Sequence, residues 1–432
     1  MTAIYIDCTD LCYANSNTGI QRVERNIIRS AIELSESFGV TVIPVAYLGK
    51  YAGLRRVHKD KDDGLWKLGY FEKVYLSCLE PKRLRLVSKA VFPAIAVLLE
   101  RYWDKIRYLL LPVLVLILPL MCFLSVLVVF CRGNSLKLEK GDVYFIPGPS
   151  WWVYDLKQQF VAVKSVGAKV MVLLHDIIAI DHPDYCDNKL SAAFSHHIET
   201  VLAYSDTLFF DSEYTKTKLK AYFLRSHIGC SSELVVNYPG FSIDLVNSDR
   251  SVRSFVSSAT NDAYIAVSTL EPRKNHQYLL DAFDLIWHKA PNVKLCIIGK
   301  YGWKSEKMVE RIVSHPYYGK QLFWFEDLDD NELLYAYRNA KACIYPSIVE
   351  GFGLPLIEAL SLGCPVFASD IPVFHEVAGD CCQYFSLDEQ ESLVNLIVKD
   401  QDVDADAVSE LNSFSWPDWK QSTSHLLKHM IK

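Results

Sequence analysis

Short apolar runs alternate with helix-like segments along most of this 432-residue chain, and this alternation is the feature that most constrains its fold. In the first half, strands are predicted at residues 3–7, 40–47, 142–146, 169–174 and 205–210. Between the first two of these runs, residues 19–34 carry apolar side chains at helical spacing. Strands that alternate with helices in this way predict a parallel sheet flanked by helices.

The second half repeats the pattern. Strands are predicted at residues 264–267, 293–298, 322–325, 342–345 and 365–368, and helices at residues 275–288, 330–340 and 354–361. The polar, serine-rich stretch 247–261 indicates a linker between the halves. We therefore expect an α/β protein with two Rossmann-like domains that face each other across a cleft, at residues 1–246 and 262–412. Because ligands bind beyond the carboxyl ends of strands in such sheets, functional residues are expected in the loops that follow strands.

Composition excludes several classes of protein. The chain has 45 Lys and Arg against 51 Asp and Glu, and its net charge of −6 gives no general attraction to nucleic acid. The 12 cysteines are scattered without a CxxC pair, so no zinc site is expected and free thiols fit the cytosol. A strand-like run follows Met1 almost directly, so no signal peptide is expected.

One segment departs from the pattern of a soluble protein. Residues 108–131 contain no charge, and 24 residues are long enough to cross about 30 Å of hydrocarbon. Basic residues suited to an anionic membrane surface precede the run: Lys82, Arg83, Arg85, Lys89, Arg101, Lys105 and Arg107. The alternative is a buried core helix, which would need protein on every side.

The flanks of this segment limit its topology. If residues before and after it share one sheet, a single crossing would place them on opposite sides of the membrane. We therefore expect an apolar insertion at about residues 82–132 that forms a re-entrant or in-plane hairpin, bent at Pro112 and Pro119. A two-span hairpin is the second possibility. Either form would hold the protein at the cytoplasmic face of the inner membrane.

Residues 345–359 form the strongest motif. A predicted strand ends, Glu350 follows, Gly351-Phe352-Gly353 comes next, and a helix begins at Leu354. The glycines let backbone N–H groups approach a ligand, and a helix N-terminus favours an anion such as a diphosphate. Glu350 and Glu358 are candidates to accept hydrogen bonds from sugar and ribose hydroxyls. The alternative is that one acid caps the helix and the other lies on the surface.

A second motif, residues 268–275, follows the first predicted strand of the second half. Arg273 and Lys274 bring two positive charges to the carboxyl end of that strand. Arginine binds a diphosphate through two hydrogen bonds, and lysine acts as a point charge. A solvated basic pair is the alternative, but cations at a helix start oppose the helix dipole, which favours a ligand-binding role.

Together, the two motifs resemble those of retaining glycosyltransferases of family 4, which have the GT-B fold. The resemblance covers most of the chain except about residues 50–140. It implies that Arg273 and Lys274 bind the donor diphosphate, that Glu350 contacts the donor sugar, and that Glu358 contacts the ribose. It also implies that Gly351, Phe352, Gly353 and Leu354 belong to the loop that binds sugar and phosphate.

The N-terminal half matches the family at three further places. Gly19, within residues 17–22, resembles the glycine loop after the first strand, where many relatives have two adjacent glycines. His175 resembles the residue near the reacting sugar, although a lone histidine at a strand end is otherwise structural. Residues 211–215 resemble a helix-entry motif, for which N-capping by Ser212 is the alternative.

Residues 413–432 resemble the C-terminal helix that crosses back to the first domain.

The resemblance implies a nucleotide-sugar-dependent hexosyltransferase of bacterial surface polysaccharide or O-antigen synthesis. The donor is a nucleotide diphosphate sugar, for which the Glu-Pro-Arg-Lys-Asn sequence favours mannose, and the acceptor is a lipid-linked glycan. In this interpretation Arg273 and Lys274 stabilise the leaving diphosphate, while His175 and Glu350 orient the sugar. No cofactor and no metal are expected, because the resemblance implies that basic residues and helix dipoles stabilise the leaving diphosphate. The acidic stretches 327–329 and 402–406 are candidates for a metal site, but the chain lacks a histidine–carboxylate ligand cluster.

Two other interpretations stay open at this point. The first is another GT-B activity, such as a sugar-nucleotide epimerase. The second is a non-catalytic, membrane-anchored scaffold. The apolar insertion argues against a soluble epimerase, and the intact Arg273, Lys274, Glu350 and Glu358 argue against a scaffold.

Overall fold

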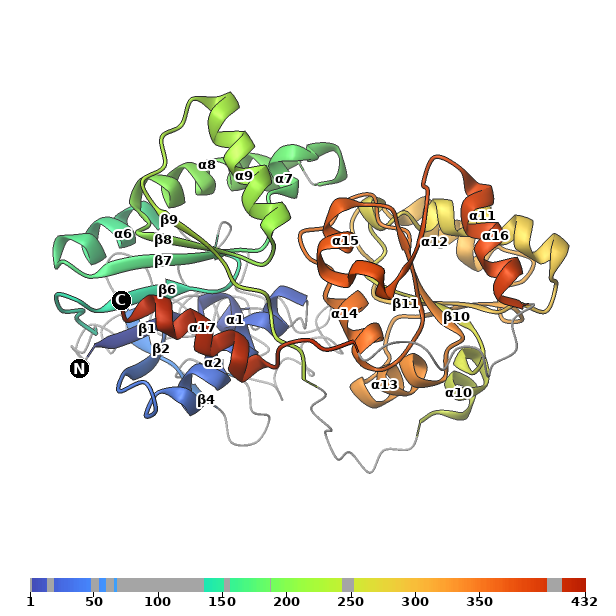
Figure 1. The fold of residues 1–432 in the computed structure, drawn as a ribbon, viewed down its shortest axis with the longest axis horizontal. Helices are drawn as coiled ribbons and strands as arrows, with labels where there is room; N and C mark the ends of the chain where they lie inside the picture. Colours follow the sequence, from blue (N-terminus) through green and yellow to red (C-terminus); the bar gives the residue numbers. More distant parts are fainter. Residues whose placement is uncertain are drawn as a thin grey trace, which may run out of the picture. The chain divides into compact units, whose positions relative to one another are not determined.

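The predicted alternation of strands and helices is present in both halves of the chain (Figure 1). The computed structural model describes residues 2–13, 19–47, 54–59, 66–67, 136–150, 156–186, 188–242, 252–401 and 414–432. The apolar insertion predicted at residues 82–132 and the acidic stretch 402–406 lie outside these described residues. No helix in the described part of the chain combines the length and apolar character that a membrane span needs.

The chain divides into two compact units. The first unit comprises Met1–Val172, Tyr204–Asp206 and Ile431, and the second comprises Leu173–Ala203, Thr207–Met430 and Lys432.

In the first unit, strand β1 (Ala3–Asp7) lies between β2 (Thr41–Tyr47) and β6 (Val143–Ile146) and is parallel to both. Strand β7 (Lys169–Leu174) is parallel to β6, and the short β3 (Leu54–Arg56) is antiparallel to β2. The remaining elements are α1 (Thr9–Tyr13), α2 (Gly19–Leu34), β4 (His58–Lys59), β5 (Trp66–Lys67) and α6 (Leu156–Ser165).

Helix α2 confirms the helix predicted at residues 19–34. Its apolar residues Val23, Ile27, Ile28 and Ala31 are all buried, as expected for one face of a helix that covers a sheet. Strand β6 is buried along its whole length, which explains its continuous apolar sequence.

The second unit begins inside β7. It continues through α7 (Ile178–Asp181), the 3₁₀ turn η2 (Pro183–Tyr185), α8 (Asn188–Tyr204), β8 (Thr207–Phe210), α9 (Glu213–Ser226) and β9 (Glu233–Val236). Strands β8 and β9 are parallel. The strand order of this seven-stranded sheet is β3-β2-β1-β6-β7-β8-β9.

A second sheet of six parallel strands lies wholly in the second unit, in the order β12-β11-β10-β13-β14-β15. Its strands are β10 (Tyr264–Val267), β11 (Leu295–Ile298), β12 (Leu322–Phe325), β13 (Ala342–Tyr345), β14 (Val366–Ser369) and β15 (Gln383–Phe385). The helices of this region are α10 (Ser254–Thr260), α11 (His276–Lys289), α12 (Glu306–Val313), α13 (Asp330–Asn339), α14 (Leu354–Ser361), α15 (Pro372–Ala378) and α16 (Gln390–Gln401). Two short turns, η3 (Pro272–Lys274) and η4 (Gly379–Cys381), complete it. Helix α10 lies within residues 247–261, where we expected a linker.

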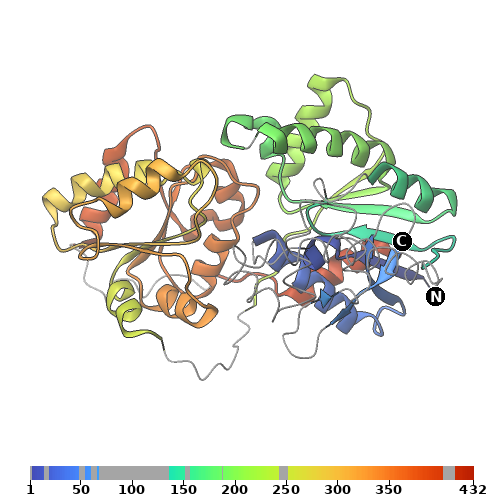
Figure 2. The same cartoon turned by 180° about the vertical axis from the view of Figure 1, so that it is seen from behind.

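Helices cover both faces of this second sheet (Figures 1 and 2). Side chains of a strand alternate between faces, and β10 shows this alternation clearly. Ile265 and Val267 pack in a core with α10, α13, α14 and α15, whereas Tyr264 and Ala266 pack in a second core with α11, α12 and α16. The carboxyl ends of the strands are thereby fixed between two rigid layers.

The C-terminal helix α17 (Trp419–Met430) lies against the segment that follows β9. Asn237 donates a hydrogen bond to Ser422 at 3.1 Å and contacts His425 at 2.9 Å. Gly240 permits this contact, because a Cβ atom there would lie 2.5 Å from the backbone of Trp419.

Candidate functional site

The two sequence motifs meet at the carboxyl ends of neighbouring strands. Strand β10 precedes residues 268–275, β13 precedes residues 346–353, and these strands pair in parallel. The backbone N–H of Ile348 donates to the carbonyl oxygen of Arg273 at 2.8 Å, which joins the two loops directly. Strand order therefore brings together residues that are more than 70 positions apart in the sequence.

Glu350 is the centre of a buried charge cluster at this junction. Its carboxylate accepts a hydrogen bond from Arg273 Nη1 at 2.6 Å, a second from Ser347 Oγ at 2.8 Å and a third from Lys274 Nζ. Arg273 also donates from Nε to Glu271 at 2.9 Å. Two cations and two carboxylates thus balance each other, which offsets the cost of burying charge.

The neighbouring charges decide the protonation state of Glu350. Burial alone would raise the pKa of its carboxyl group, but Lys274 and Arg273 lower this pKa to about 2. Burial raises the pKa of Glu271, and the same two cations partly oppose that rise. Burial and the charge of Arg273 lower the pKa of Lys274, while the two glutamates favour its charged form. Glu350 is therefore an anion at neutral pH.

The loop Gly351-Phe352-Gly353, called the glycine loop from here on, needs its two glycines for steric reasons. Gly353 has φ of 107°, a left-handed conformation that places it as the N-cap of α14, which starts at Leu354. A Cβ atom on Gly351 would lie 2.4 Å from the carbonyl oxygen of His175. Phe352 is buried, and its ring centroid lies 5.6 Å from that of Trp416.

Glu358 lies apart from this charge cluster. It is buried on the second turn of α14, and its Oε2 accepts a hydrogen bond from Tyr337 at 3.1 Å. Gly19, the other predicted donor-binding residue, is the first residue of α2 and belongs to the first unit.

His175 follows β7 and is buried next to Asp211, which follows β8. His175 Nδ1 lies 2.6 Å from Asp211 Oδ2. The sequence motif at residues 211–215 indicated only a helix start, and Ser212 does cap α9 by accepting a hydrogen bond from the N–H of Thr215. Sequence reasoning missed the contact of Asp211 with His175, because it depends on the order of two strands.

The same helix start also contacts the glycine loop. Ser212 Oγ donates to the carbonyl oxygen of Gly351 at 2.6 Å, and Thr215 Oγ1 donates to it at 3.1 Å. The carboxylate of Glu376, on α15, accepts the N–H groups of Glu213 and Tyr214 at 2.6 and 2.8 Å. Ser347 lies within the motif at residues 345–359, but sequence reasoning gave it no role, and Glu376 lies outside both motifs.

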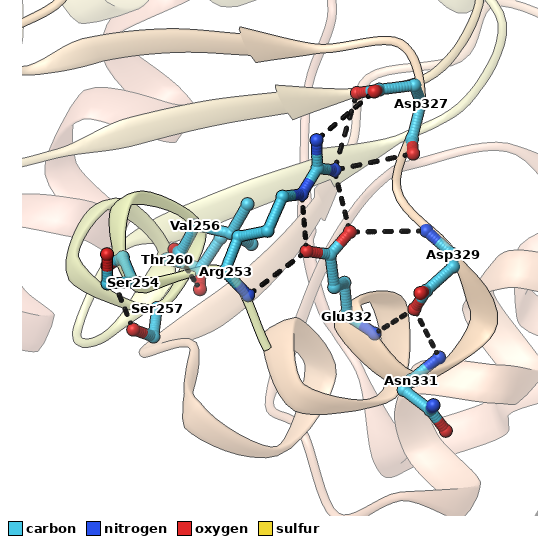
Figure 3. A network of polar contacts seen from close by, with 9 residues as sticks. All are labelled: Arg253, Ser254, Val256, Ser257, Thr260, Asp327, Asp329, Asn331 and Glu332. Carbon is cyan, nitrogen blue, oxygen red and sulfur yellow. Dashed lines mark hydrogen bonds and ion pairs between the residues drawn. The ribbon is translucent and has the colours of Figure 1, made fainter. Parts of the chain in front are cut away.

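The acidic stretch 327–329 serves a structural purpose (Figure 3). Asp327 accepts a hydrogen bond from Arg253 at 3.1 Å, and Arg253 also donates to Glu332 at 2.6 Å. Asp329 caps α13 and forms a capping box with Glu332. In the part of the chain that the structure describes, no group of three or more His, Cys, Asp or Glu side chains is placed to hold a metal ion.

Two cavities differ in their suitability for an anionic ligand. A narrow cavity of about 10 Å³ lies beside Glu350 and Gly351 and is lined further by Asp176 and Lys218. A larger cavity of about 630 Å³ lies near α11 and α16, but its charged lining residues are Asp281, Asp388, Glu389 and Glu391. Because carboxylates repel a diphosphate, the acidic lining of the larger cavity does not suit such a ligand.

Comparison with known proteins finds a matching family model and several relatives. Residues 248–399 match the family model described as glycosyl transferases group 1. The serotype-specific mannosyltransferase WbdA of Escherichia coli is 28% identical over 292 residues, which are 64% of this chain and 35% of that protein. The chain thus spans about a third of the length of this curated relative. The O-antigen chain mannosyltransferase B of Escherichia coli is 25% identical over 314 residues, which are 68% of this chain and 75% of that protein.

Solved structures resemble the chain over its whole length. Anabaena HepE, in complex with UDP and glucose, aligns with a TM-score of 0.59 at 15% identity and covers 100% of this chain and 99% of its own. Sucrose-phosphate synthase from Thermosynechococcus elongatus aligns with a TM-score of 0.56 at 12% identity and covers 100% of this chain and 95% of its own. At identities this low, the structural alignments show the fold alone. They confirm the predicted GT-B fold with two Rossmann-like parallel sheets. The family model and the relatives confirm the resemblance to family 4 glycosyltransferases, and residues 248–399 are the part of the chain that is similar to the glycosyl transferases group 1 model.

Proposed function

We propose that this chain transfers a hexosyl group, with mannose as the expected sugar, from a nucleotide diphosphate sugar to a glycan acceptor with retention of anomeric configuration. The observation that carries this proposal is the buried cluster of Arg273, Lys274 and Glu350 at the carboxyl ends of β10 and β13. A paired arginine and lysine beside the start of a helix can neutralise a diphosphate. The family match of residues 248–399 supports the same chemistry.

Leaving-group stabilisation is the main catalytic effect in this proposal. As the bond between the sugar and the diphosphate breaks, negative charge develops on the phosphate oxygens. Arg273 and Lys274 stabilise that charge, and the ion pair of Arg273 with Glu271 holds the guanidinium group in place when Glu350 gives up its hydrogen bonds. The acceptor hydroxyl forms its bond to the anomeric carbon on the face that the diphosphate leaves, and its proton leaves with the diphosphate. No nucleophilic side chain is needed, and no metal is needed to balance the charge.

Glu350 has two roles in this scheme. Without donor, its carboxylate pairs with the two cations that are meant for the diphosphate. When the diphosphate takes these hydrogen bonds, Glu350 becomes available to accept hydrogen bonds from hydroxyls of the donor sugar. The exchange replaces one anion by another, so the two cations remain paired throughout.

The acceptor in this proposal is a lipid-linked glycan in O-antigen synthesis at the cytoplasmic face of the inner membrane. Relatives named as O-antigen mannosyltransferases support the pathway and the sugar. The uncharged sequence of residues 108–131 and the basic residues before it support the membrane location.

A donor panel tests the proposal. The full chain is incubated with GDP-mannose, UDP-glucose, UDP-galactose or UDP-N-acetylglucosamine and a membrane extract that contains lipid-linked glycans. Mass spectrometry of the lipid fraction should show the addition of one or more hexose units from GDP-mannose. The new linkage, assigned by NMR, should have the same anomeric configuration as the donor.

The variant Arg273→Ala and the control Arg311→Ala separate specific transfer from background. Arg311 pairs with Asp281 and Asp284 and is not part of the charge cluster. The Arg311→Ala variant should therefore transfer sugar at the normal rate. Interconversion of the free nucleotide sugar without transfer would indicate an epimerase. Absence of both transfer and donor binding across the panel would indicate a scaffold. Either result would refute the proposal.

A further inference from the structure

Asp211 is the acidic partner of His175, and its contacts indicate a role in orienting that histidine. Both side chains are buried, with 4% and 8% of their surface exposed, and the two atoms Asp211 Oδ2 and His175 Nδ1 lie 2.6 Å apart. Asp211 Oδ1 is also buried and accepts no hydrogen bond from any described residue. A carboxylate that is buried with one oxygen unpaired costs stability. The bond to His175 is therefore the interaction that the acid makes in the described structure.

Burial raises the pKa of the Asp211 carboxyl group, and the neighbouring His175 opposes this rise. When Asp211 is ionised its carboxylate can only accept hydrogen bonds, and Nδ1 of His175 then carries the hydrogen. This fixes the tautomer of the imidazole and the direction of its ring. Nε2 is then the ring atom whose protonation or hydrogen bonding can change during a reaction. A histidine that orients a sugar needs this kind of fixed ring, because a small rotation would misplace Nε2.

Hydrogen bonds next to Asp211 and His175 connect this pair to the loop at residues 351–353. Ser212, next to Asp211, donates to the carbonyl oxygen of Gly351 at 2.6 Å, and Thr215 donates to the same oxygen. On its other side, Gly351 lies so close to the His175 carbonyl that no side chain fits between them. One turn of chain, from Asp211 to Thr215, therefore contacts both the histidine and the loop that follows Glu350.

We propose that Asp211 is a positioning residue, which fixes the tautomer and orientation of His175 for the reaction. Asp211 does not contact the donor in this role. The inference rests on the proposed function, in which His175 orients the donor sugar, and it adds a residue to which no role in the reaction was assigned. Ser212 and Thr215 help to position Asp211, because their hydrogen bonds fix the backbone next to it.

The first experiment measures the tautomer directly. The full chain is labelled with ¹⁵N-histidine, and the His175 signals are assigned by their loss in His175→Gln. In the unsubstituted chain, the Nδ1–H tautomer should predominate at pH 8. In Asp211→Asn, and in Asp211→Ala, the population of this tautomer should fall. An unchanged tautomer in both variants would overturn the inference.

The second experiment measures turnover. Asp211→Asn should lower kcat by about 10-fold or more, the scale seen when the carboxylate partner of a functional histidine is lost, with the donor KM changed less than about threefold. In a His175→Gln background, the same substitution should cause no further loss of kcat. An equal loss in both backgrounds would mean that Asp211 does not act through His175, and would contradict the inference.

A matched control and a folding check complete the design. Asp206→Asn removes another acid next to β8, but Asp206 pairs with Lys164 and should leave both tautomer and kcat unchanged. Thermal melting of each variant shows whether it is folded, and Asp211→Ala replaces Asp211→Asn if the amide is not tolerated. The tautomer measurement requires no sugar transfer. A chain that transfers no sugar would therefore refute the proposed function while still testing the link between Asp211 and His175.

Discussion

Arg273 Nη1 donates a hydrogen bond to Glu350 at 2.6 Å, although the two residues are 77 positions apart in the sequence. The cation that we expect to bind a diphosphate is thus paired with the acid that we expect to bind a sugar. Glu350 is buried and the side chain of Arg273 is 17% exposed, so solvent screens this pairing only weakly. Lys274 Nζ donates a hydrogen bond to the other oxygen of the same carboxylate. Both cations are therefore paired with Glu350 in the absence of a donor.

Loss of either cation should reduce sugar transfer strongly. We expect Arg273→Ala or Lys274→Ala to lower kcat/KM by at least about 10²-fold, since one preorganised charge-stabilising donor contributes roughly 2.7–4 kcal/mol. The comparison is with Arg311→Ala, assayed under the same conditions. Normal turnover in both folded variants would exclude the charge cluster as the donor site.

Removal of the charge on Glu350 should separate binding from turnover. Glu350→Gln leaves Arg273 and Lys274 without their anion, so we expect GDP to bind about 10-fold more tightly, which corresponds to 1.4 kcal/mol. Transfer should nevertheless fall, because the variant lacks the carboxylate that contacts the sugar. Isothermal titration calorimetry measures the affinity, with Glu310→Gln on the exposed face of α12 as the control. Weaker GDP binding by Glu350→Gln would contradict the proposed exchange of anions.

Buried His276 should make stability depend on pH. It is 3% exposed at the start of α11, and burial, with a smaller effect of Lys274, lowers its pKa from 6.5 to about 4. Below pH 6.5 the unfolded chain binds a proton at this histidine that the folded chain refuses. The free energy of unfolding should therefore fall as pH drops from 6.5 to 4, by about 3 kcal/mol from this group.

Urea denaturation at intervals between pH 7 and pH 4.5 measures this slope. His276→Gln should make the slope less steep, although not flat, because burial lowers the pKa of His197 to about 4 as well. His288→Gln, at an exposed position of the same helix, should leave the slope unchanged. Glu350, with a pKa of about 2 in the folded chain and 4.5 in the unfolded chain, loses its stabilising contribution mainly below pH 4.5 and so contributes little in this range. Parallel pH profiles for His276→Gln and the unsubstituted chain would show that His276 is not the responsible group.

Chelation should leave the proposed transfer unaffected. Arg273 and Lys274 supply the positive charge that a metal would otherwise provide, so we expect the same rate in excess EDTA as in untreated enzyme. Transfer of hexose to the lipid fraction is the readout. A loss of rate that magnesium or manganese restores would show that a metal carries out the role given to these two residues.

The apolar segment should anchor the chain at the membrane. Replacement of Leu114, Leu116 and Leu118 by Asp should release the protein to the soluble fraction, because burial of apolar surface contributes about 25 cal/mol per Å². Transfer to a short water-soluble acceptor should survive better than transfer to a lipid-linked one. Cysteines introduced at Ser37 and Ser165 should both label from the cytoplasmic side. Labelling from opposite sides would be incompatible with strands of one sheet on both flanks of the segment.

The sequence by itself determined many of the strands and helices and the positions of the two motif loops, residues 268–275 and 346–353. Strand β10 and helices α2 and α14 lie where the apolar periodicity predicted them, because burial on one or both faces leaves a local pattern. Glycines at positions 351 and 353 and the cations at 273 and 274 were visible because backbone conformation and charge are properties of single residues.

Only the tertiary structure decided which side chains meet. The pairing of Glu350 with Arg273 follows from the adjacency of β10 and β13, and the pairing of His175 with Asp211 follows from the adjacency of β7 and β8. The sequence shows where each strand ends, but not which strands are neighbours. Strand order depends on how whole layers pack, so contacts between loops that follow different strands have no local signal.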